Sequence, residues 1–282
     1  MTNSAQDKYD QLSALLRDME SALVAFSGGV DSTLLLRAAH DALGDRAVAA
    51  TGLSQTYADE EMREATAIAA DMGVEHIMVQ TMELTDPRYA DNTHQRCFFC
   101  KSELYNRLID VARERVLRHV IDGSNADDRG DFRPGMRAAT QLGVRSPLQE
   151  VNLTKSEIRQ LSAALGLRTW DKPAMACLSS RFAYGDPITP EKLKRVGLAE
   201  SNLRQLGYRG IRVRHHGDIA RLEFPVERLA EALEQAAAIV TAVKEAGYRY
   251  VALDLEGYRS GSMNEVLNAR FKPGGLRRPS AV

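Results

Sequence analysis

The amino-acid sequence predicts an α/β fold with a doubly wound parallel sheet, followed by a second, smaller α+β domain. In the first half, short apolar or β-branched runs alternate with helical patterns, which is typical of parallel strands covered by helices on both faces. In the second half, two short strands joined by a Gly-Asp turn stand between two helices. The length of 282 residues agrees with two domains.

The first domain is expected to span residues 1–170. Its helices are recognised from apolar residues at three- and four-residue spacing, and the last of them opens with a capping box formed by Thr154 and Glu157. Ligands of such sheets bind beyond the carboxyl ends of the strands, where we expect the site. The expected elements in order are strand 22–26, helix 31–43, strand 47–53, helix 59–72, strand 75–81, helix 99–116, strand 119–123 and helix 155–165.

The second domain is expected to span residues 171–265 and begins in a loop rich in proline and small residues. Its long helix should carry an apolar stripe that includes Val226 and Leu233. The tail, 266–282, carries Gly, Pro and Arg and is expected to be disordered. The expected elements are helix 190–206, strand 211–215, strand 219–224, helix 225–246 and strand 248–255.

Composition and charge narrow the classes of function. A net charge of −1 provides no basic field for nucleic acid, so we expect no nucleic-acid partner. No apolar run reaches the roughly 20 residues of a membrane span, and residues 1–20 do not resemble a secretory signal, so we expect no membrane partner. Three cysteines do not form a secreted disulfide framework, and a reducing cytoplasm is the expected location.

A glycine-containing loop lies between the first strand and the first helix. Glycine lets the backbone approach an anion, and the amides and dipole of the following helix favour it. The loop has no Walker lysine, so a different phosphate chemistry is expected. Ser54 and Ser124 follow two other strands and should lie at the same edge of the sheet. The residues of the loop are Ser27, Gly28, Gly29, Val30, Asp31 and Ser32.

The three cysteines leave several kinds of chemistry open. Cys97 and Cys100 form a C-x-x-C pair, and Cys177 follows much later. The spacing is compatible with an iron–sulfur cluster that has one open iron, or with persulfide or disulfide chemistry. A zinc site completed by His94 and a packed, inert pair are the other two interpretations.

The loop of residues 27–32 resembles the signature of the PP-loop ATP pyrophosphatase superfamily, in which the fold is of the adenine nucleotide alpha hydrolase type. The resemblance implies that ATP and Mg²⁺ bind here, that a substrate oxygen attacks the α-phosphate and that pyrophosphate leaves. Asp31 then becomes a catalytic candidate that organises phosphate or metal. The turn with Gly123, Ser124 and Asp127 resembles the family's second nucleotide-facing turn, and Asp127 is a candidate for holding magnesium.

Two further segments, 170–181 around Cys177 and 212–218, resemble the LarE family of ATP-dependent sulfur transferases. With the loop, the resemblance covers roughly residues 20 to 260. It implies that ATP adenylates a carboxylate of pyridinium-3,5-biscarboxylic acid mononucleotide, a small-molecule nucleotide. A sulfur atom then replaces AMP and gives a thiocarboxylate, on the route to the nickel-pincer cofactor of lactate racemase. The family also implies a homo-oligomer, a hexamer.

The cysteines separate two versions of that family. In the sacrificial version, the cysteine matching Cys177 is the catalytic nucleophile and gives up its own sulfur. This sequence departs from that version at Cys97 and Cys100, and resembles the members that hold a four-iron four-sulfur [4Fe-4S] cluster. The resemblance then implies that Cys97, Cys100 and Cys177 are ligands and that an extra sulfide on the open iron is the donor. The source of that sulfide is not readable from the sequence.

Basic residues of the second domain are candidates for substrate binding. Strand alternation places Arg212 and Arg214 on one face, and Ser180 and Arg181 follow Cys177 directly. Arginine pairs with phosphate and carboxylate, both of which the implied substrate carries. The alternative is an exposed polar face of a hairpin.

Two other functions remain open from the sequence. Some PP-loop enzymes thiolate tRNA with three cysteines and a cluster, but the low net charge disfavours this class. A non-catalytic adenine-nucleotide sensor with zinc or redox cysteines is the other.

Overall fold

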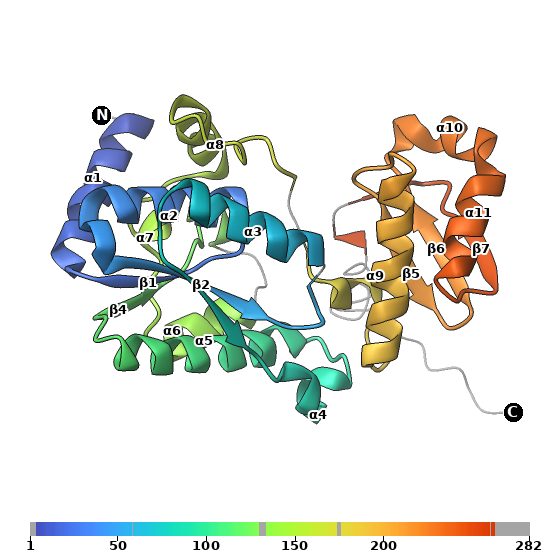
Figure 1. The fold of residues 1–282 in the computed structure, drawn as a ribbon, viewed down its shortest axis with the longest axis horizontal. Coiled ribbons are helices and arrows are strands. Elements are labelled where there is room, and N and C mark those ends of the chain that lie inside the picture. Colours follow the sequence, from blue (N-terminus) through green and yellow to red (C-terminus); the bar gives the residue numbers. More distant parts are fainter. Residues whose placement is uncertain (1–3, 58, 130–133, 174–175, 260, 263–282) are drawn as a thin grey trace, which may run out of the picture. The chain divides into compact units, whose positions relative to one another are not determined.

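The structure is a computed structural model that describes residues 4–57, 59–129, 134–173, 176–259 and 261–262. The chain divides into two compact units, Met1–Cys177 and Leu178–Val282. Figure 1 shows the parallel sheet of the first unit and the smaller sheet of the second. The tail expected to be disordered, 266–282, lies outside the described residues.

The first unit is built on a four-stranded parallel sheet in the order β3-β2-β1-β4. Its strands are β1 (Ala22–Ala25), β2 (Ala47–Leu53), β3 (His76–Gln80) and β4 (His119–Ile121). The larger helices are α1 (Ala5–Met19), α2 (Val30–Leu43), α3 (Asp59–Asp71), α5 (Arg96–Glu114), α6 (Pro134–Gln141) and α8 (Lys155–Ala164), and the short ones are α4 (Pro87–Ala90) and α7 (Pro147–Glu150). The predicted α/β class is therefore confirmed, although the sequence did not predict α1 or α6.

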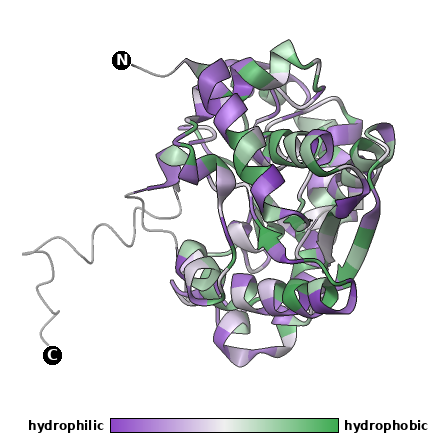
Figure 2. Cartoon of the chain, turned by 90° about the vertical axis from the view of Figure 1, so that its left-hand side faces the viewer, coloured by the Kyte–Doolittle hydropathy of each residue, from purple (hydrophilic) through white to green (hydrophobic). Residues whose placement is uncertain are grey.

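Helices cover both faces of this sheet, as the term doubly wound requires (Figure 1). On one face, Ala22 and Val24 of β1 pack with apolar residues of α1, α2, α3 and α8. On the other face, Leu23 packs with α5 and α6. Successive residues of a strand point to opposite faces, so this short apolar run serves both cores. Figure 2 shows green, hydrophobic strands in the middle of the unit and mixed green and purple helices around them.

The second unit has a three-stranded sheet in the order β5-β6-β7. The expected hairpin is present, because β5 and β6 pair antiparallel, and β7 joins β6 in parallel. The strands are β5 (Arg212–His216), β6 (Ile219–Glu223) and β7 (Tyr250–Leu253), and the helices are α9 (Pro190–Gln205), α10 (Leu229–Glu234) and α11 (Ala236–Glu245). A 3₁₀ turn at Leu178–Arg181 opens the unit.

The prediction of a single long helix over residues 225–246 is wrong. The structure has a 3₁₀ turn at Val226–Arg228, then α10 and α11, with a break at Gln235, where ψ is 17°. The break rotates the apolar stripe, so Val226 and Leu233 are exposed while Ile239 and Val243 are buried. Periodicity alone does not reveal such a break, because the spacing of apolar residues continues across it.

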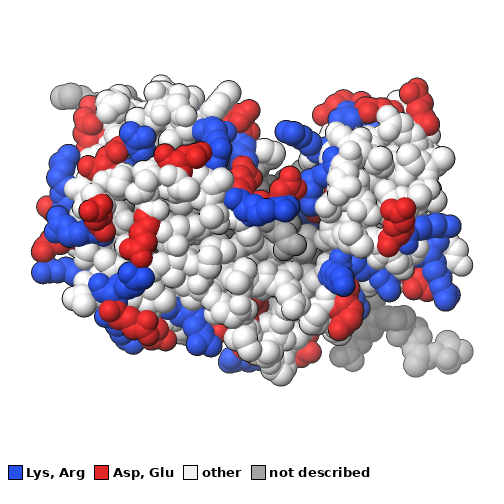
Figure 3. All heavy atoms as spheres, in the orientation of Figure 1, with Lys and Arg blue, Asp and Glu red and all other residues white. Residues whose placement is uncertain are grey.

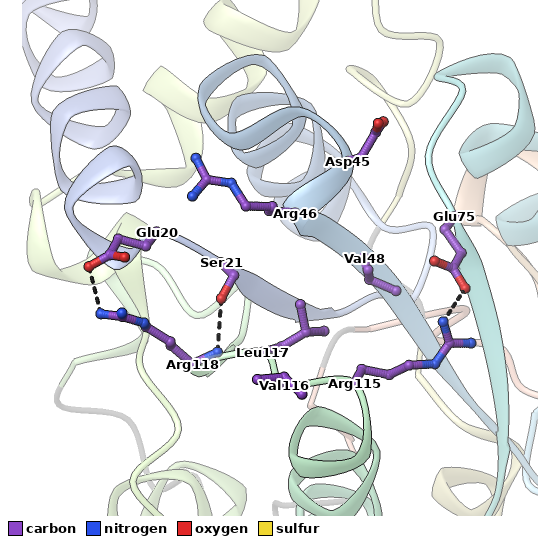
Figure 4. A pocket seen from close by; sticks show the side chains of 10 residues that line it. All are labelled: Glu20, Ser21, Asp45, Arg46, Val48, Glu75, Arg115, Val116, Leu117 and Arg118. Carbon is purple, nitrogen blue, oxygen red and sulfur yellow. Dashed lines mark hydrogen bonds and ion pairs between the residues drawn. The ribbon is translucent and has the colours of Figure 1, made fainter.

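A cavity of about 380 Å³ lies at the amino ends of the four strands, at the opposite end of the sheet from the loop of residues 27–32 (Figure 4). Four of its charged side chains form two ion pairs, Arg118 with Glu20 at 2.6 Å and Arg115 with Glu75 at 2.9 Å. Beside it, Val116 is 85% exposed and has φ 56°, at the end of α5. The amide of Leu117 closes the helix by donating to Ala112 O at 2.8 Å.

The surface charge of the two units is mixed. Lys and Arg (blue) and Asp and Glu (red) are interspersed on the face shown in Figure 3. None of the helices in the described ranges has the length and apolar character that would let it cross a bilayer.

Candidate active site

The glycine loop connects the end of β1 to the start of α2. Gly28 has φ 66°, a left-handed conformation that favours glycine, and a Cβ there would lie 3.2 Å from Ala65 Cα on α3. Gly29 is the N-cap of α2 and has no side chain to satisfy the first helical amides. Ser32 Oγ donates to Gly29 O at 3.2 Å and lies 3.2 Å from Ser27 Oγ. The loop thus presents unpaired helix amides and two hydroxyls at one place.

The turn after β4 lies against this loop. A Cβ on Gly123 would come within 2.9 Å of Ser32 N, so only glycine permits the approach. Asn125 Nδ2 donates to Asp31 Oδ1 at 3.2 Å and ties the turn to the loop. Ser124 is held within its own turn, where its hydroxyl donates to Asp122 Oδ2 at 3.2 Å. Asn125 is a site residue that the sequence prediction missed.

A lysine from the first turn of α8 reaches the same carboxylate. Lys155 Nζ lies 2.5 Å from Asp31 Oδ2, and the Lys155 amide donates to Asp127 Oδ2 at 2.7 Å. Asp31 is therefore shared between Lys155 and Asn125, and Asp127 caps α8. The capping box at Thr154 located this helix start in the sequence, but its contact with Asp31 depends on the fold.

A second lysine approaches the loop from another direction. Lys172 Nζ donates to Gly28 O at 3.0 Å and to Glu64 Oε2 at 2.7 Å. No pattern in the sequence marks Lys172 as a partner of a loop 144 residues earlier. The structure thus brings two cations, Lys155 and Lys172, to a phosphate-type loop that lacks the Walker lysine.

Ser54, the remaining predicted nucleotide residue, lies past the end of β2. Its hydroxyl donates to Glu83 Oε1 at 2.5 Å, and Thr56 Oγ1 donates to the same oxygen at 3.0 Å. Glu83 is buried. The proton of the Ser54 hydroxyl is therefore used within the protein, and the serine would meet a ligand only as an acceptor.

The cysteines gather in the first unit. Cys97 and Cys100 lie on the first turns of α5, which begins at Arg96, three residues earlier than expected. All three cysteines are described, and none forms a disulfide. Surrounding protein atoms raise the pKa of the Cys97 thiol although the residue is exposed, and the Cys177 thiolate raises it further. Burial, Glu83 and Cys177 raise the pKa of the Cys100 thiol well above its ordinary value.

The structure does not group the cysteines tightly around one point. Within the described ranges, no three His, Cys, Asp or Glu side chains are close enough to hold one metal ion, so neither the three cysteines nor His94 forms a zinc site there. Cys177 lies in the same neighbourhood as Cys97 and Cys100, since its charge acts on both thiols. A four-iron cluster takes its thiolates at separate corners, whereas zinc needs them around one atom. Three thiolates are donors of the type that such a cluster takes.

In the second unit, the predicted substrate residues form a buried charged network. Arg181 makes two bonds to Glu200, at 2.8 and 3.0 Å, with the side chains 4% and 2% exposed. Arg214 Nη2 lies 2.7 Å from Glu223 Oε2, and Arg214 Nη1 donates to Ser180 O at 2.9 Å. Arg181 and Arg214 thus have carboxylate partners inside the protein.

Arg212 is placed differently in the same unit. Its guanidinium lies 4.9 Å from the centre of the Tyr258 ring, and Nη1 donates to Ile211 O at 2.7 Å. Burial lowers the pKa of Arg212, and the neighbouring charge of Arg181 lowers it further. The structure therefore brings Arg212 together with Arg181, and adds a third guanidinium to the two that pair with glutamates.

Comparison with known proteins agrees with this geometry. The model of the NAD synthase family matches residues 10–112. The chain is 40% identical over 258 residues to pyridinium-3,5-bisthiocarboxylic acid mononucleotide synthase of Lactiplantibacillus plantarum, covering 91% of this chain and 93% of that protein. It is 47% identical over 264 residues to an uncharacterized protein of Synechocystis sp., covering 93% and 98%. A component of the glutamine-hydrolyzing GMP synthase of Archaeoglobus fulgidus is 28% identical over 204 residues, covering 62% and 61%.

The parallel sheet, the glycine loop and these relatives define an ATP-dependent enzyme of the PP-loop class. The chain belongs to the LarE family of ATP-dependent sulfur transferases. The family resemblance seen in the sequence is thereby confirmed.

Proposed function

We propose that this sulfur transferase acts on pyridinium-3,5-biscarboxylic acid mononucleotide and converts a carboxylate into a thiocarboxylate for nickel-pincer cofactor synthesis. The observation that carries the proposal is the 40% identity, over nearly the whole chain, with a synthase of the bisthiocarboxylic acid mononucleotide. The grouping of three thiols in the unit that holds the phosphate-type loop supports it.

The first half-reaction is activation of the carboxylate. A substrate carboxylate oxygen attacks the α-phosphorus of ATP, the bond to the β-phosphate oxygen breaks, and pyrophosphate leaves. Ser27 and the amide of Gly29 hold the departing pyrophosphate at the start of α2, and Ser32 joins them when its hydroxyl proton turns from Gly29 O to a phosphate oxygen. Asp31 and Asp127 would hold Mg²⁺, which when bound neutralises phosphate charge. Gly123, Ser124 and Ser54 line the neighbouring strand ends and complete the proposed nucleotide site.

The second half-reaction delivers sulfur. A sulfur nucleophile attacks the activated carboxyl carbon, AMP leaves, and the thiocarboxylate remains. We propose that Cys97, Cys100 and Cys177 hold a [4Fe-4S] cluster, which when bound would supply a sulfide for this attack. The three cysteines would orient and retain the donor, because thiolates are the ligands that such a cluster takes. A sacrificial Cys177 is the alternative donor.

The charged network of the second unit suits the anionic groups of the substrate. We propose that Arg212 binds its phosphate or carboxylate, and that Ser180, Arg181 and Arg214 shape the same surface. The buried partners Glu200 and Glu223 fix the geometry of Arg181 and Arg214. Fixed guanidinium groups bind an anion with less loss of side-chain freedom than mobile ones.

Self-association and a cytoplasmic location belong to the same proposal. A reducing cytoplasm keeps thiols available for chemistry. Several large apolar side chains of the second unit are exposed and suit contact with another copy, as the hexamer expected for the family would require. They are Ile219, Val226, Leu233, Tyr250 and Leu255. Light scattering on the purified protein would measure the assembly.

The decisive experiment measures iron, acid-labile sulfide and pyrophosphate release on one anaerobically purified sample. We expect about four iron atoms per chain, a value that follows from the cluster type. Pyrophosphate release should depend on the pyridinium substrate, and Cys97→Ala should abolish multiple turnovers of sulfur transfer. A colourless protein with stoichiometric zinc would exclude the cluster. Stimulation by tRNA, and not by the pyridinium nucleotide, would exclude the proposed substrate.

A further inference from the structure

Lys172 reaches the glycine loop from a backbone that is itself held in place. Arg159 of α8 donates to Trp170 O at 2.7 Å and to Lys172 O at 2.8 Å. The Lys172 side chain is only 12% exposed, and its Nζ ends on Gly28 O at 3.0 Å. A buried ammonium that ends on a backbone carbonyl restricts the rotation of that peptide group.

The peptide group bound in this way is the one between Gly28 and Gly29. A trans peptide is planar, so its carbonyl and its N–H point in opposite directions. When Lys172 holds Gly28 O, the N–H of Gly29 is therefore turned away from Lys172. That N–H has no backbone acceptor within the described residues, and it lies at the N-terminus of α2. Two glycines in succession would otherwise let this peptide rotate easily.

We propose that Lys172 is a positioning residue of the nucleotide site. By holding Gly28 O it aims the amide of Gly29 at the bound pyrophosphate group of ATP. It also places a positive charge beside a loop that lacks the Walker lysine. The inference rests on the proposed use of residues 27–32 as the pyrophosphate site, and adds a residue that the loop motif does not contain.

The competing explanation is that Lys172 serves only its ion pair with Glu64. The pair is 2.7 Å long, but the Glu64 side chain is 40% exposed, and pairs of this kind contribute little. Glu64→Gln removes the pair and leaves the bond to Gly28 O. The two explanations therefore differ in what this substitution does to nucleotide binding.

Lys192 provides a control for the loss of a lysine with the same kind of partners. Its Nζ donates to a backbone carbonyl, Pro187 O, at 2.8 Å and to Asp186 Oδ1 at 2.6 Å. Its side chain is 29% exposed. Lys192 thus repeats the chemistry of Lys172 in the second unit, and it holds no residue of the glycine loop or of α8.

The test is calorimetric titration of the full chain with magnesium and α,β-methylene ATP, an analogue that cannot release pyrophosphate. Lys172→Met should raise the Kd about tenfold, the effect expected for one charge-assisted hydrogen bond. Glu64→Gln and Lys192→Met should stay within about twofold of the wild type. Thermal unfolding of each variant checks that it is folded.

Two results would overturn the proposal: wild-type affinity in Lys172→Met, or an equal loss of affinity in Glu64→Gln. If Lys172→Met does not fold, Lys172→Gln, whose shorter side chain does not reach Gly28 O, replaces it, and wild-type affinity there also overturns the proposal. The titration requires no sulfur transfer. A wild-type protein that binds the analogue but makes no thiocarboxylate would refute the proposed function and leave the role of Lys172 standing.

Discussion

The carboxylate of Asp31 has two donors in this structure, and both bear on how the site takes up a metal. Asn125 occupies Oδ1 and Lys155 occupies Oδ2. A carboxylate oxygen that is paired with an ammonium at 2.5 Å is a weaker ligand for magnesium, because the ammonium and the metal draw on the same negative charge. Lys155 therefore competes with magnesium for Asp31.

Removing this competitor should tighten magnesium binding. The Lys155 and Asp31 side chains are 33% and 24% exposed, so the pair contributes about 1 kcal/mol at most. Lys155→Met should therefore lower the magnesium concentration for half-maximal binding of the ATP analogue by about fivefold. A magnesium titration at fixed analogue measures this. Lys192→Met is the control, and an unchanged or higher magnesium requirement in Lys155→Met would contradict the prediction.

At the level of elements, the start of α8 carries much of the site. Thr154 and Glu157 form a complete capping box, with the Thr154 amide donating to Glu157 Oε2 at 2.8 Å. The next residue, Lys155, contacts both Asp31 and Asp127 through its side chain and its amide. The cap thereby fixes the start of α8, where Lys155 contacts Asp31 of the glycine loop and Asp127 of the turn after β4.

Loss of this cap should affect binding as well as stability. Thr154→Ala should reduce the free energy of unfolding by about 1 kcal/mol, as for other N-caps. It should also weaken binding of the ATP analogue about threefold, because the Lys155 amide that donates to Asp127 loses its fixed position. Thr189→Ala removes the equivalent cap of α9, where Thr189 Oγ1 accepts from Lys192 N at 3.3 Å. That variant should lose similar stability and keep its affinity, and equal affinities in both variants would count against the idea.

The elements also show what can be inferred from sequence. The strands β1 to β4 and the glycine loop follow from local runs of residues, and the structure confirms the sheet. No local sequence pattern marks Asn125 or Lys172. Asn125 contacts a residue about 94 positions away, and Lys172 contacts one about 144 positions away. The break at Gln235 cannot be predicted from periodicity, because the backbone angles of that single residue change while the spacing of apolar residues continues. Local patterns therefore predict where the loop lies, and only the fold reveals which side chains complete it.

At the scale of the whole molecule, each compact unit has its own buried interior. The second unit depends on a charged core as well as an apolar one. Burial by itself would raise the pKa of Glu200, but the charge and hydrogen bonds of Arg181 outweigh burial and hold the pKa below its ordinary value. A carboxyl with a depressed pKa stabilises the fold at pH values above the pKa that it has in the unfolded chain. This stabilisation is lost as the pH falls through the lower pKa that it has in the folded protein.

Breaking this pair should destabilise the second unit selectively. Glu200→Gln removes the carboxylate that pairs with the buried Arg181 at 2.8 Å, and should cost about 3 kcal/mol or more. Calorimetry should show one unfolding transition at a lowered temperature and a second one whose temperature the ATP analogue still raises. In the control, Glu256→Gln removes an exposed pair with Arg259 and should cost less than about 1 kcal/mol. The wild type should lose stability below about pH 4, and Glu200→Gln should lose less. A pH profile identical for both proteins would contradict this account.

Val116 also lowers the stability of the first unit. It occupies the position after α5 at which a left-handed residue closes the helix, with φ 56°, and most helices use glycine there. A β-branched residue in this conformation costs about 1 to 2 kcal/mol, and Val116 recovers little by packing because it is 85% exposed. Replacing Val116 with glycine would therefore increase the free energy of unfolding, and it would leave the cysteines and the glycine loop unchanged. A Val116→Gly background would let destabilising site variants be purified and compared as folded proteins.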